Sequence, residues 1–358
     1  MTNLPTAFIA LQGSRVRLDG GVLLVEHADH PTATVQLGHI GALVVLGRVD
    51  LTVAAMLALV DRDIGCVLAS RTGRMRAAVV APSLRRCALR SLQHQLDAER
   101  VETDGQAARP LAVVCNIVRD KLDAVIGILT QHHRTHDDVE LSKPIAIIRA
   151  LRDRVHNASS IDRARGFEGA AMACYFSAMP ALCRGELTTS SRSRRPPQDA
   201  INAALSFGYS LLVNELTSTL HARGLDPALG ILHPPTDGRP SLALDLVEPL
   251  RHAIVDRLVL RAANRRELVP TDFEPFTDER SHSAGTRFTD AGRSKFLRLY
   301  HAALCATITD GASAPRPARA LFADVADEFE QDLRARFAAP SDFARTAVDD
   351  VCTSTSSN

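Results

Sequence analysis

Residues 224–251 read GLDPALGILHPPTDGRPSLALDLVEPLR and join the end of one predicted helix to the start of the next through a loop rich in Pro and Gly. Gly224 is placed to end the first helix, because glycine adopts the left-handed C-terminal conformation without strain. His233 lies in the loop, and Asp245 and Glu248 follow three residues apart on the second helix, which puts both acids on one face. Imidazole and carboxylate ligands suit Mg²⁺ or Mn²⁺, so one further acid from elsewhere would complete a metal site.

Pro249 disturbs the helix that carries these two acids. It has no N–H, so it cannot donate a hydrogen bond to the carbonyl of Asp245, four residues earlier. The helix predicted over residues 241–265 should therefore kink or loosen at this point. We expect the bend to help Asp245 and Glu248 face one cavity instead of diverging along the helix.

The composition is that of a soluble globular protein with more than one core. The chain has 358 residues, 46% hydrophobic and 23% charged, a length that suggests two domains. No apolar run approaches the roughly 20 residues that span a bilayer and no secretion signal begins the chain, so we expect a cytoplasmic protein without membrane contact. Seven scattered cysteines without a C-x-x-C pair argue against a zinc cluster or a disulfide framework. The net charge of +1 means that affinity for nucleic acid has to come from local basic patches.

Residues 7–80 are typical of a small β domain. One helix is predicted to interrupt it over residues 50–63, with Asp50 as its cap and an apolar stripe of Val53, Met56, Leu57 and Val60. The rest consists of short β-rich segments separated by turn residues, namely FIAL, SRVRLD, GVLLVEH, TATVQL, ALVVLG, CVLAS and MRAAVV.

Helical periodicity replaces the turn signals beyond about residue 81. After residue 310 the composition shifts to Ala, Pro, Arg and Asp, with one amphipathic helix predicted at 318–337 and an unfolded end. The prediction is an α+β fold with a β domain over residues 1–85, a helical domain over 86–310, and a C-terminal helix and flexible tail over 311–358. One predicted helix is the segment LAVVCNIVRDKLDAVIGIL, whose apolar face consists of Val114, Ile117, Leu122 and Ile126. The other predicted helices cover residues 143–154, 161–176, 197–223, 241–265 and 290–309.

Glu168 is the candidate for the third acid. It stands in RGFEGAAMACYF, where Gly166, Gly169, Ala170 and Ala171 remove bulk around a single carboxylate. Small neighbours let another chain segment or a ligand approach closely. The alternative is an exposed glutamate on an Ala-rich helix, since most glutamates are solvated.

Three segments in this order resemble the motifs of the CRISPR-associated endonuclease and integrase family called CRISPR-associated protein one. They are GFEGAAMACYF, RRPPQDAINAALSFGYSLL and GLDPALGILHPPTDGRPSLALDLVEPLR. A fourth segment, AGRSKFLRLY from Ala291, resembles the basic segment that follows the active site in this family. The resemblance covers about residues 165–300, and the order of strands and then helices before it is similar as well.

The resemblance implies an N-terminal β-sandwich-like domain that forms a homodimer, followed by a larger all-α catalytic domain. It implies that Glu168, His233 and Glu248 bind Mg²⁺ or Mn²⁺, with Asp245 near the metal or supporting it. The implied activity is metal-dependent DNA cleavage and strand transfer, in which a 3′-hydroxyl of a captured double-stranded DNA fragment attacks a repeat boundary of the CRISPR array. The implied partner is CRISPR-associated protein two, which bridges two dimers.

Basic side chains near these motifs are predicted DNA contacts, because they bind phosphate without reading sequence. A solvated surface is the alternative for any one of them. Tyr209 is expected to pack in the core, with a hydroxyl aimed at the DNA end as the second reading. The predicted phosphate contacts are Arg192, Arg194, Arg195, Arg239, Arg251, Arg293, Lys295 and Arg298, and Arg71, Arg74 and Arg76 would extend the path.

Two other functions remain open from the sequence. One is a DNA-binding assembly protein whose acids bind metal only for structure or not at all, and the other is a general metal-dependent repair phosphodiesterase. The presence of every predicted site residue argues against a catalytically decayed relative. Turnover on branched DNA without a CRISPR repeat would distinguish the repair enzyme.

Overall fold

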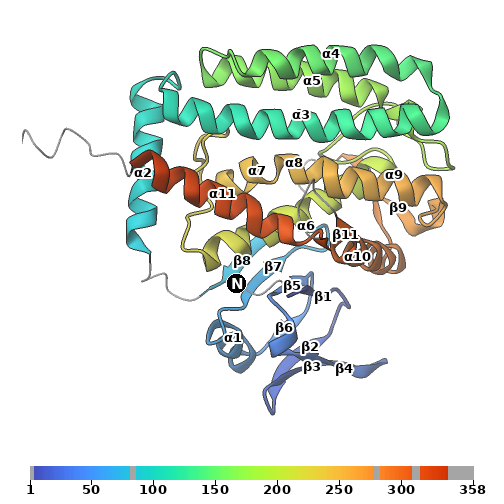
Figure 1. The fold of residues 1–358 in the computed structure, drawn as a ribbon. Helices are drawn as coiled ribbons and strands as arrows, with labels where there is room; N and C mark the ends of the chain where they lie inside the picture. Colours follow the sequence, from blue (N-terminus) through green and yellow to red (C-terminus); the bar gives the residue numbers. More distant parts are fainter. Residues whose placement is uncertain (1–3, 81–85, 278–282, 309–314, 338–358) are drawn as a thin grey trace, which may run out of the picture.

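The computed structural model describes residues 4–80, 86–277, 283–308 and 315–337. In Figure 1 the strands of the N-terminal segment form the lower part of the molecule, and the helices of the remaining chain form a larger upper part. This arrangement confirms a mixed α+β fold. None of the described helices is long and apolar enough to cross a membrane.

The N-terminal part contains two four-stranded sheets. Their strands are β1 (Thr6–Ile9), β2 (Arg15–Asp19), β3 (Val22–His27), β4 (His30–Gln36), β5 (Ala42–Leu46), β6 (Asp50–Leu51), β7 (Gly65–Ala69) and β8 (Met75–Val79). One sheet has the order β1-β5-β7-β8, with β8 antiparallel to β7 and the other neighbours parallel. The other sheet has the order β4-β3-β2-β6.

Strand β5 is buried on both faces because its sheet lies between two other layers. Leu43 belongs to a small core that it shares with Leu23 of the other sheet. Val44 and Leu46 point the opposite way and belong to the large core built with the helices. This one sheet therefore joins the N-terminal part to the helical part.

Helix α1 (Val53–Val60) differs from the prediction in its cap and its buried face. Thr52 caps it through a side-chain hydrogen bond, whereas Asp50 lies in β6. Val53 and Leu57 of the predicted apolar stripe are 68% and 56% exposed. The sequence VAAMLALV is apolar on every face, so periodicity could not identify the side that packs. The helix buries Ala55, Ala58 and Leu59.

Three long helices form one layer of the larger part. They are α3 (Ala108–His136), α4 (Ser142–Val155) and α5 (Ile161–Leu182), which lie side by side in Figure 1. All three were predicted, although α5 continues beyond the predicted end. The predicted apolar face of α3 is confirmed, since it buries Val114, Ile117, Leu122 and Ile126.

The helix after this layer, α6 (Ala200–Ala222), is largely buried and is capped by Asp199. Gly224 follows its end with a φ of +71°, as predicted for a residue that terminates a helix. The segment predicted as one helix over residues 241–265 is divided, and its interruption at Val247 agrees with the loosening expected from Pro249. Its parts are α7 (Ser241–Leu246), α8 (Glu248–Leu250), the π-helical η3 (Arg251–Asp256) and α9 (Arg257–Asn264).

The larger part is not all-α, which corrects the prediction. A hairpin of β9 (Phe273–Thr277) and β10 (Ala284–Phe288) lies among the helices, and the rings of Phe273 and Phe288 stack at 4.5 Å. The two rings are cross-strand partners in this hairpin, a pairing of two short segments that helical periodicity does not detect. The remaining elements are α2 (Cys87–Glu102), α10 (Asp290–Cys305), β11 (Thr307–Ile308), β12 (Arg316–Pro317), and the 3-10 turns η1 (Leu37–His39), η2 (Val139–Leu141) and η4 (Pro270–Asp272).

The last described helix, α11 (Ala320–Phe337), packs against α2 and α6. Arg223 at the end of α6 donates to Asp327 of α11 at 2.9 Å. The helix therefore shares the core of the helical part. The predicted unfolded end and the predicted boundary at residue 85 lie outside the described residues. Its buried face consists of Phe322, Ala326, Phe329 and Leu333.

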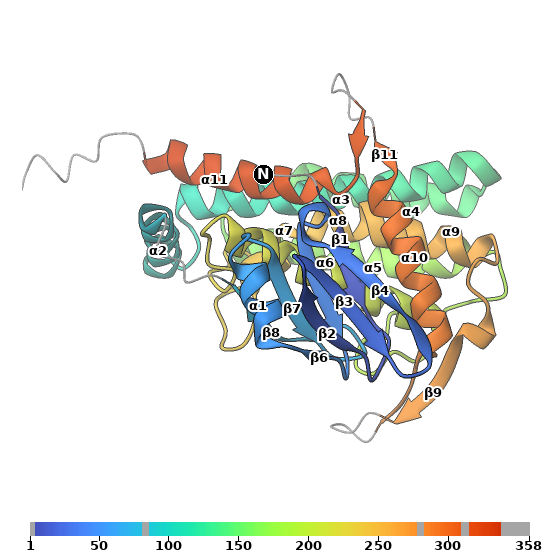
Figure 2. The same ribbon diagram turned by 90° about the horizontal axis from the view of Figure 1, so that it is seen from below.

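Glu215 of α6 connects the N-terminal part to the helical part. Its carboxylate accepts hydrogen bonds from the Thr6 hydroxyl of β1 at 2.6 Å and from the Tyr300 hydroxyl of α10 at 2.7 Å. Figure 2 shows α10 running alongside the strands. Burial raises the pKa of Glu215 from 4.5 to about 7.

This raised pKa predicts a loss of stability as the pH rises from 4.5 to 7, because the folded state then has to hold a buried charge that the unfolded chain solvates. The shift corresponds to about 3 kcal/mol at most. In urea denaturation at pH 5, 6, 7 and 8, the stability of Glu215→Gln relative to wild type should increase with pH. The exposed Glu140→Gln serves as the control, and a pH-independent difference for Glu215→Gln would contradict the prediction.

Candidate active site

His233 and Asp245 form the best-defined part of the site. Asp245 of α7 is fully buried, and it accepts hydrogen bonds from the backbone N–H groups of Ile231 at 2.7 Å, Leu232 at 2.9 Å and His233 at 3.0 Å. The same carboxylate lies 2.6 Å from Nδ1 of His233. Asp245 therefore fixes the loop that carries His233.

This contact decides which nitrogen of His233 is available. A carboxylate partner favours a proton on Nδ1, which leaves the lone pair of Nε2 free to bind an ion. Burial raises the pKa of Asp245 above its ordinary value, and the hydrogen bonds from His233 and the loop oppose that rise. The side chain of His233 is 33% exposed, so a ligand from solvent can reach it.

Glu168 and Glu248 come from different helices and converge on Lys121 of α3. The Nζ atom of Lys121 contacts Oε1 of Glu168 and lies 2.7 Å from Oε2 of Glu248. The side chains of Lys121 and Glu248 are 6% and 4% exposed, and that of Glu168 is 22% exposed. Lys121 was not among the predicted site residues, although a lysine on the apolar face of a predicted helix is an unusual feature that indicates a buried charge.

Glu248 has a second cationic partner in Arg251. The Nη1 atom of Arg251 lies 2.9 Å from Oε1 of Glu248. Burial acts in the opposite direction, but Arg251 and Lys121 together lower the pKa of Glu248 to about 2. Asp245 contacts the loop, whereas Glu248 contacts these two cations. Their contacts therefore do not support the expectation that the bend at Pro249 turns both acids toward one cavity.

Arg165 joins the two halves of the site. It lies on α5 one turn before Glu168, and its Nε donates to the carbonyl of Leu232 at 2.7 Å. Since Leu232 directly precedes His233, this bond holds the helix of Glu168 against the loop of His233. Arg165 carries no recognisable signal in the sequence, because its partner is a backbone carbonyl 67 residues later in the chain.

The two glycines around Glu168 leave free space in the described structure. A Cβ atom added at Gly166 or Gly169 would meet no other atom within 4 Å. At these two positions no described segment makes the close approach that the small residues suggested. Both glycines are exposed to solvent, and residues one or two apart on a helix do not face each other, so this open space does not lie beside the Glu168 carboxylate.

The predicted ligands suit Mg²⁺ or Mn²⁺ in chemistry, since two carboxylates and an imidazole are appropriate donors. Their positions do not yet form an ion site. Among the described residues, no group of three or more His, Cys, Asp or Glu side chains is close enough to hold a metal. The ammonium of Lys121 lies between Glu168 and Glu248 instead.

Tyr209 directs its hydroxyl to the buried Asp256, donating to Oδ1 at 2.5 Å. Tyr175 donates to Oδ2 of the same carboxylate at 2.7 Å, and Nδ1 of His252 lies 2.8 Å from Oδ2. Burial acts to raise the pKa of Asp256, but His252 and the two tyrosines lower it below its ordinary value. This network supports the packing role of Tyr209 and corrects its prediction as a DNA contact through the hydroxyl.

Three of the predicted DNA contacts are open to solvent to different degrees. Arg194 and Arg195 are exposed in the loop before α6, and Arg239 is half-buried before α7. Arg192 of the same first loop instead donates to Asn202 at 2.7 Å and packs within the protein. The loop before α6 therefore presents two exposed guanidinium groups.

Two further predicted contacts are partly exposed but already paired with acids. Arg251 pairs with Glu248, and its guanidinium lies 5.3 Å from the ring centre of Tyr209. The Nζ atom of Lys295 lies 2.7 Å from Asp272. A phosphate would have to compete with these carboxylates.

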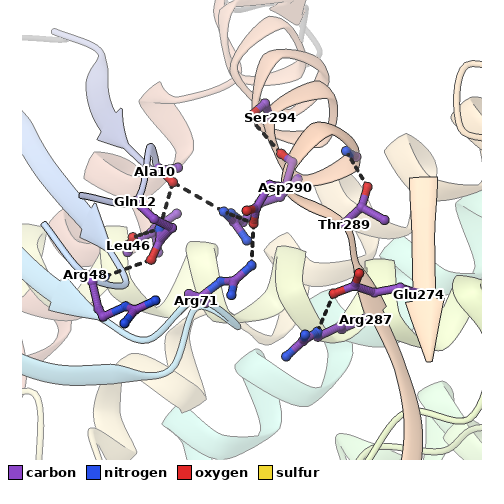
Figure 3. Close-up of polar contacts among 12 residues, drawn as sticks. Ala10, Gln12, Leu46, Arg48, Arg71, Glu274, Arg287, Thr289, Asp290 and Ser294 are labelled. Carbon is purple, nitrogen blue, oxygen red and sulfur yellow. Dashed lines mark hydrogen bonds and ion pairs between the residues drawn. The ribbon is translucent and has the colours of Figure 1, made fainter. Parts of the chain in front are cut away.

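Arg293 is buried, which corrects its prediction as a DNA contact. Its Nη2 donates to Asp290 at 2.7 Å and to the carbonyl of Ala10 at 3.3 Å. Arg71 of the N-terminal part reaches the same carboxylate of Asp290 at 2.5 Å (Figure 3). Arg293 and Arg71 thus fasten α10 to the N-terminal part.

A family model described as CRISPR associated protein Cas1 matches residues 7–302. The chain belongs to the Cas1 family. This confirms the resemblance found in the motifs, and curated members of the family are named CRISPR-associated endonuclease Cas1. The matched range includes all four predicted site residues, Glu168, His233, Asp245 and Glu248.

Curated Cas1 relatives match most of the chain. The CRISPR-associated endonuclease Cas1 2 of Rhodospirillum rubrum is 34% identical over 308 residues, which cover 83% of this chain and 85% of the relative. The CRISPR-associated endonuclease Cas1 1 of Moorella thermoacetica is 31% identical over 279 residues, covering 75% and 79%.

Solved structures share the fold. A Cas1 protein from Thermotoga maritima superposes with a TM-score of 0.75 at 24% identity, covering 92% of this chain and 97% of that one. A casposase bound to its integration product gives a TM-score of 0.75 at 20% identity, covering 93% and 91%. A chain of a Cas6-RT-Cas1–Cas2 complex gives 0.78 at 21% identity, covering 95% of this chain and 36% of that one.

Proposed function

We propose that this Cas1 protein is a metal-dependent DNA integrase that inserts captured fragments at the repeat boundary of a CRISPR array. The observation that carries the proposal is the convergence of Glu168 and Glu248, from separate helices, on one ammonium group. The orientation of the His233 ring by the buried Asp245, and the bond from Arg165 that ties the helix of Glu168 to the loop of His233, support it. Glu168, His233 and Glu248 would hold Mg²⁺ or Mn²⁺, and Asp245 would act through His233. A bound ion would supply positive charge to the scissile phosphate.

The proposed reaction is a transesterification. The 3′-hydroxyl of the captured fragment attacks a repeat phosphate, forming a new P–O bond while the bond to the repeat's own 3′ oxygen breaks. Asp245 keeps His233 in one tautomer and orientation, and Arg165 keeps the helix of Glu168 beside that loop. Hydrolysis is the same displacement with water as the attacking group.

An integration assay tests this function. The purified chain is combined with Cas2, a double-stranded DNA fragment, a repeat-bearing plasmid, and Mg²⁺ or Mn²⁺. Joining of the fragment to the repeat boundary is expected with either ion and not with a chelator. Duplex binding without joining under every metal condition would favour the non-catalytic assembly protein, and cleavage of branched DNA without a repeat would favour a repair phosphodiesterase.

The proposed assembly contains two dimers of this chain bridged by Cas2 in the cytoplasm. The N-terminal part is the proposed dimerisation domain. Val53 and Leu57 of α1 support this role, because they expose apolar side chains on that part.

Arg194 and Arg195 are the proposed phosphate contacts with the clearest exposure. Replacing both with alanine should weaken binding to duplexes of any sequence, because each contact releases about one counterion. The slope of log affinity against log salt concentration should fall by about 2 in fluorescence anisotropy titrations. Arg149→Ala, an exposed arginine on α4, is the control; an unchanged slope in the double variant would remove these residues from the DNA path.

A further inference from the structure

We propose that Lys121 is a built-in counter-cation of the metal site, whose ammonium holds Glu168 and Glu248 together until a divalent ion displaces it. The inference rests on the proposed metal-dependent function and adds a residue to it. Lys121 contacts both carboxylates from α3, a helix that contributes none of the predicted ligands. The amine thus lies at the point where an ion shared by the two glutamates would be bound.

Lys121 is buried, so its charge has to be balanced by the groups around it. Its neighbour Leu122 is fully buried in the large core, as are Val118 and Val125 on the same helix. An ammonium in such surroundings is strongly unfavourable unless it is paired. Two carboxylates within contact distance supply the pairing, and removing the amine would leave two like charges facing each other.

The charges of the site balance without a metal. Glu168 and Glu248 contribute two negative charges, and Lys121 and Arg251 contribute two positive charges. Both oxygens of Glu248 are already engaged, Oε1 by Arg251 at 2.9 Å and Oε2 by Lys121 at 2.7 Å. A divalent ion bound to Glu248 has to break one of these pairs, because two cations at such a distance repel.

Lys121 is better suited to leave than Arg251. Arg251 is held by its position over the ring of Tyr209 as well as by Glu248. A lysine is a compact point charge on a flexible stem, whereas arginine makes a fixed planar contact. The chain has 42 Lys and Arg residues, of which only Lys121, Lys143 and Lys295 are lysine. A lysine at this position therefore departs from the strong preference of the chain for arginine.

Displacement of Lys121 lowers the apparent metal affinity, since part of the binding free energy is spent on breaking the ion pairs. Removing the amine should therefore strengthen metal binding and weaken the metal-free fold. We expect Lys121→Met to bind Mn²⁺ at least about tenfold more tightly than wild type. Its melting temperature should be lower than that of wild type in chelator and should rise more on addition of Mn²⁺.

In the experiment, Mn²⁺ alone is titrated into the full-length chain without DNA, and the binding is measured by calorimetry. Melting curves are recorded with and without the ion. Lys143→Met, on the exposed side of α4, is the matched control and should behave as wild type. Lys121→Gln is the second variant, because its amide still donates to a carboxylate and preserves folding if the methionine variant fails. It should also bind Mn²⁺ more tightly than wild type.

The outcomes separate this inference from the proposed function. If the Lys121 variants bind Mn²⁺ no more tightly than wild type, the counter-cation role is overturned. Binding of Mn²⁺ by wild type in that case leaves the proposed metal-dependent function intact. Tight binding confined to the variants supports the role. Absence of binding in wild type and in every variant overturns both proposals.

Discussion

Glu168→Gln is expected to lower strand transfer by at least about 100-fold, because it removes one of the charged groups that the proposed ion needs to stabilise the transition state. Glutamine keeps the size of the side chain. Lys121 retains Glu248 as a charged partner at 2.7 Å, so the fold should persist. The measurement is the rate of fragment joining with Cas2 and a repeat plasmid under saturating Mn²⁺.

Duplex binding by Glu168→Gln should stay close to that of wild type, because phosphate contacts are made by basic groups elsewhere. This second readout separates loss of chemistry from loss of the complex. Glu102→Gln, an exposed glutamate at the end of α2, is the control for a change of charge. Strand transfer at the wild-type rate in Glu168→Gln would remove this residue from the active site.

Much of the fold follows from local sequence patterns, and the exceptions have physical causes. The run ALVVL is apolar at every position, as expected for β5, which is covered on both sides. The long helices α3 and α4 have clear periodicity. In contrast, α1 is apolar all round, so its packed face depended on the neighbouring sheets. The β9–β10 hairpin depends on the antiparallel pairing of two short strands, with Phe273 stacked on Phe288 across them, and helical periodicity does not reveal such a pairing.

The candidate site was predictable only where one motif contains both partners. His233 and Asp245 lie in one continuous segment, and the structure joins them directly. Lys121 and Arg165 act on residues far away in the chain, at Glu248 and Leu232, so their roles depend on how α3 and α5 pack. The same limit applies to Arg293, which resembled a phosphate contact in sequence but is buried against Asp290.

Asp245→Asn should damage both stability and activity, although it changes the side chain by a single group. The carboxylate receives four donors, from the N–H groups of Ile231, Leu232 and His233 and from the His233 ring. An asparagine has one acceptor oxygen and presents an NH₂ group to the remaining donors. At least one buried N–H then loses its partner, and we expect a loss of about 2–4 kcal/mol in the free energy of unfolding.

The same substitution releases His233 from its fixed orientation. Loss of a group that orients a metal ligand typically lowers metal affinity or activity by about 10- to 100-fold. Urea denaturation, Mn²⁺ titration and the strand-transfer assay should therefore all change in Asp245→Asn, whereas Asp237→Asn, an exposed acid in the same loop, should change none of them. A stable Asp245→Asn variant with wild-type strand transfer would show that neither the loop nor the orientation of His233 depends on this carboxylate.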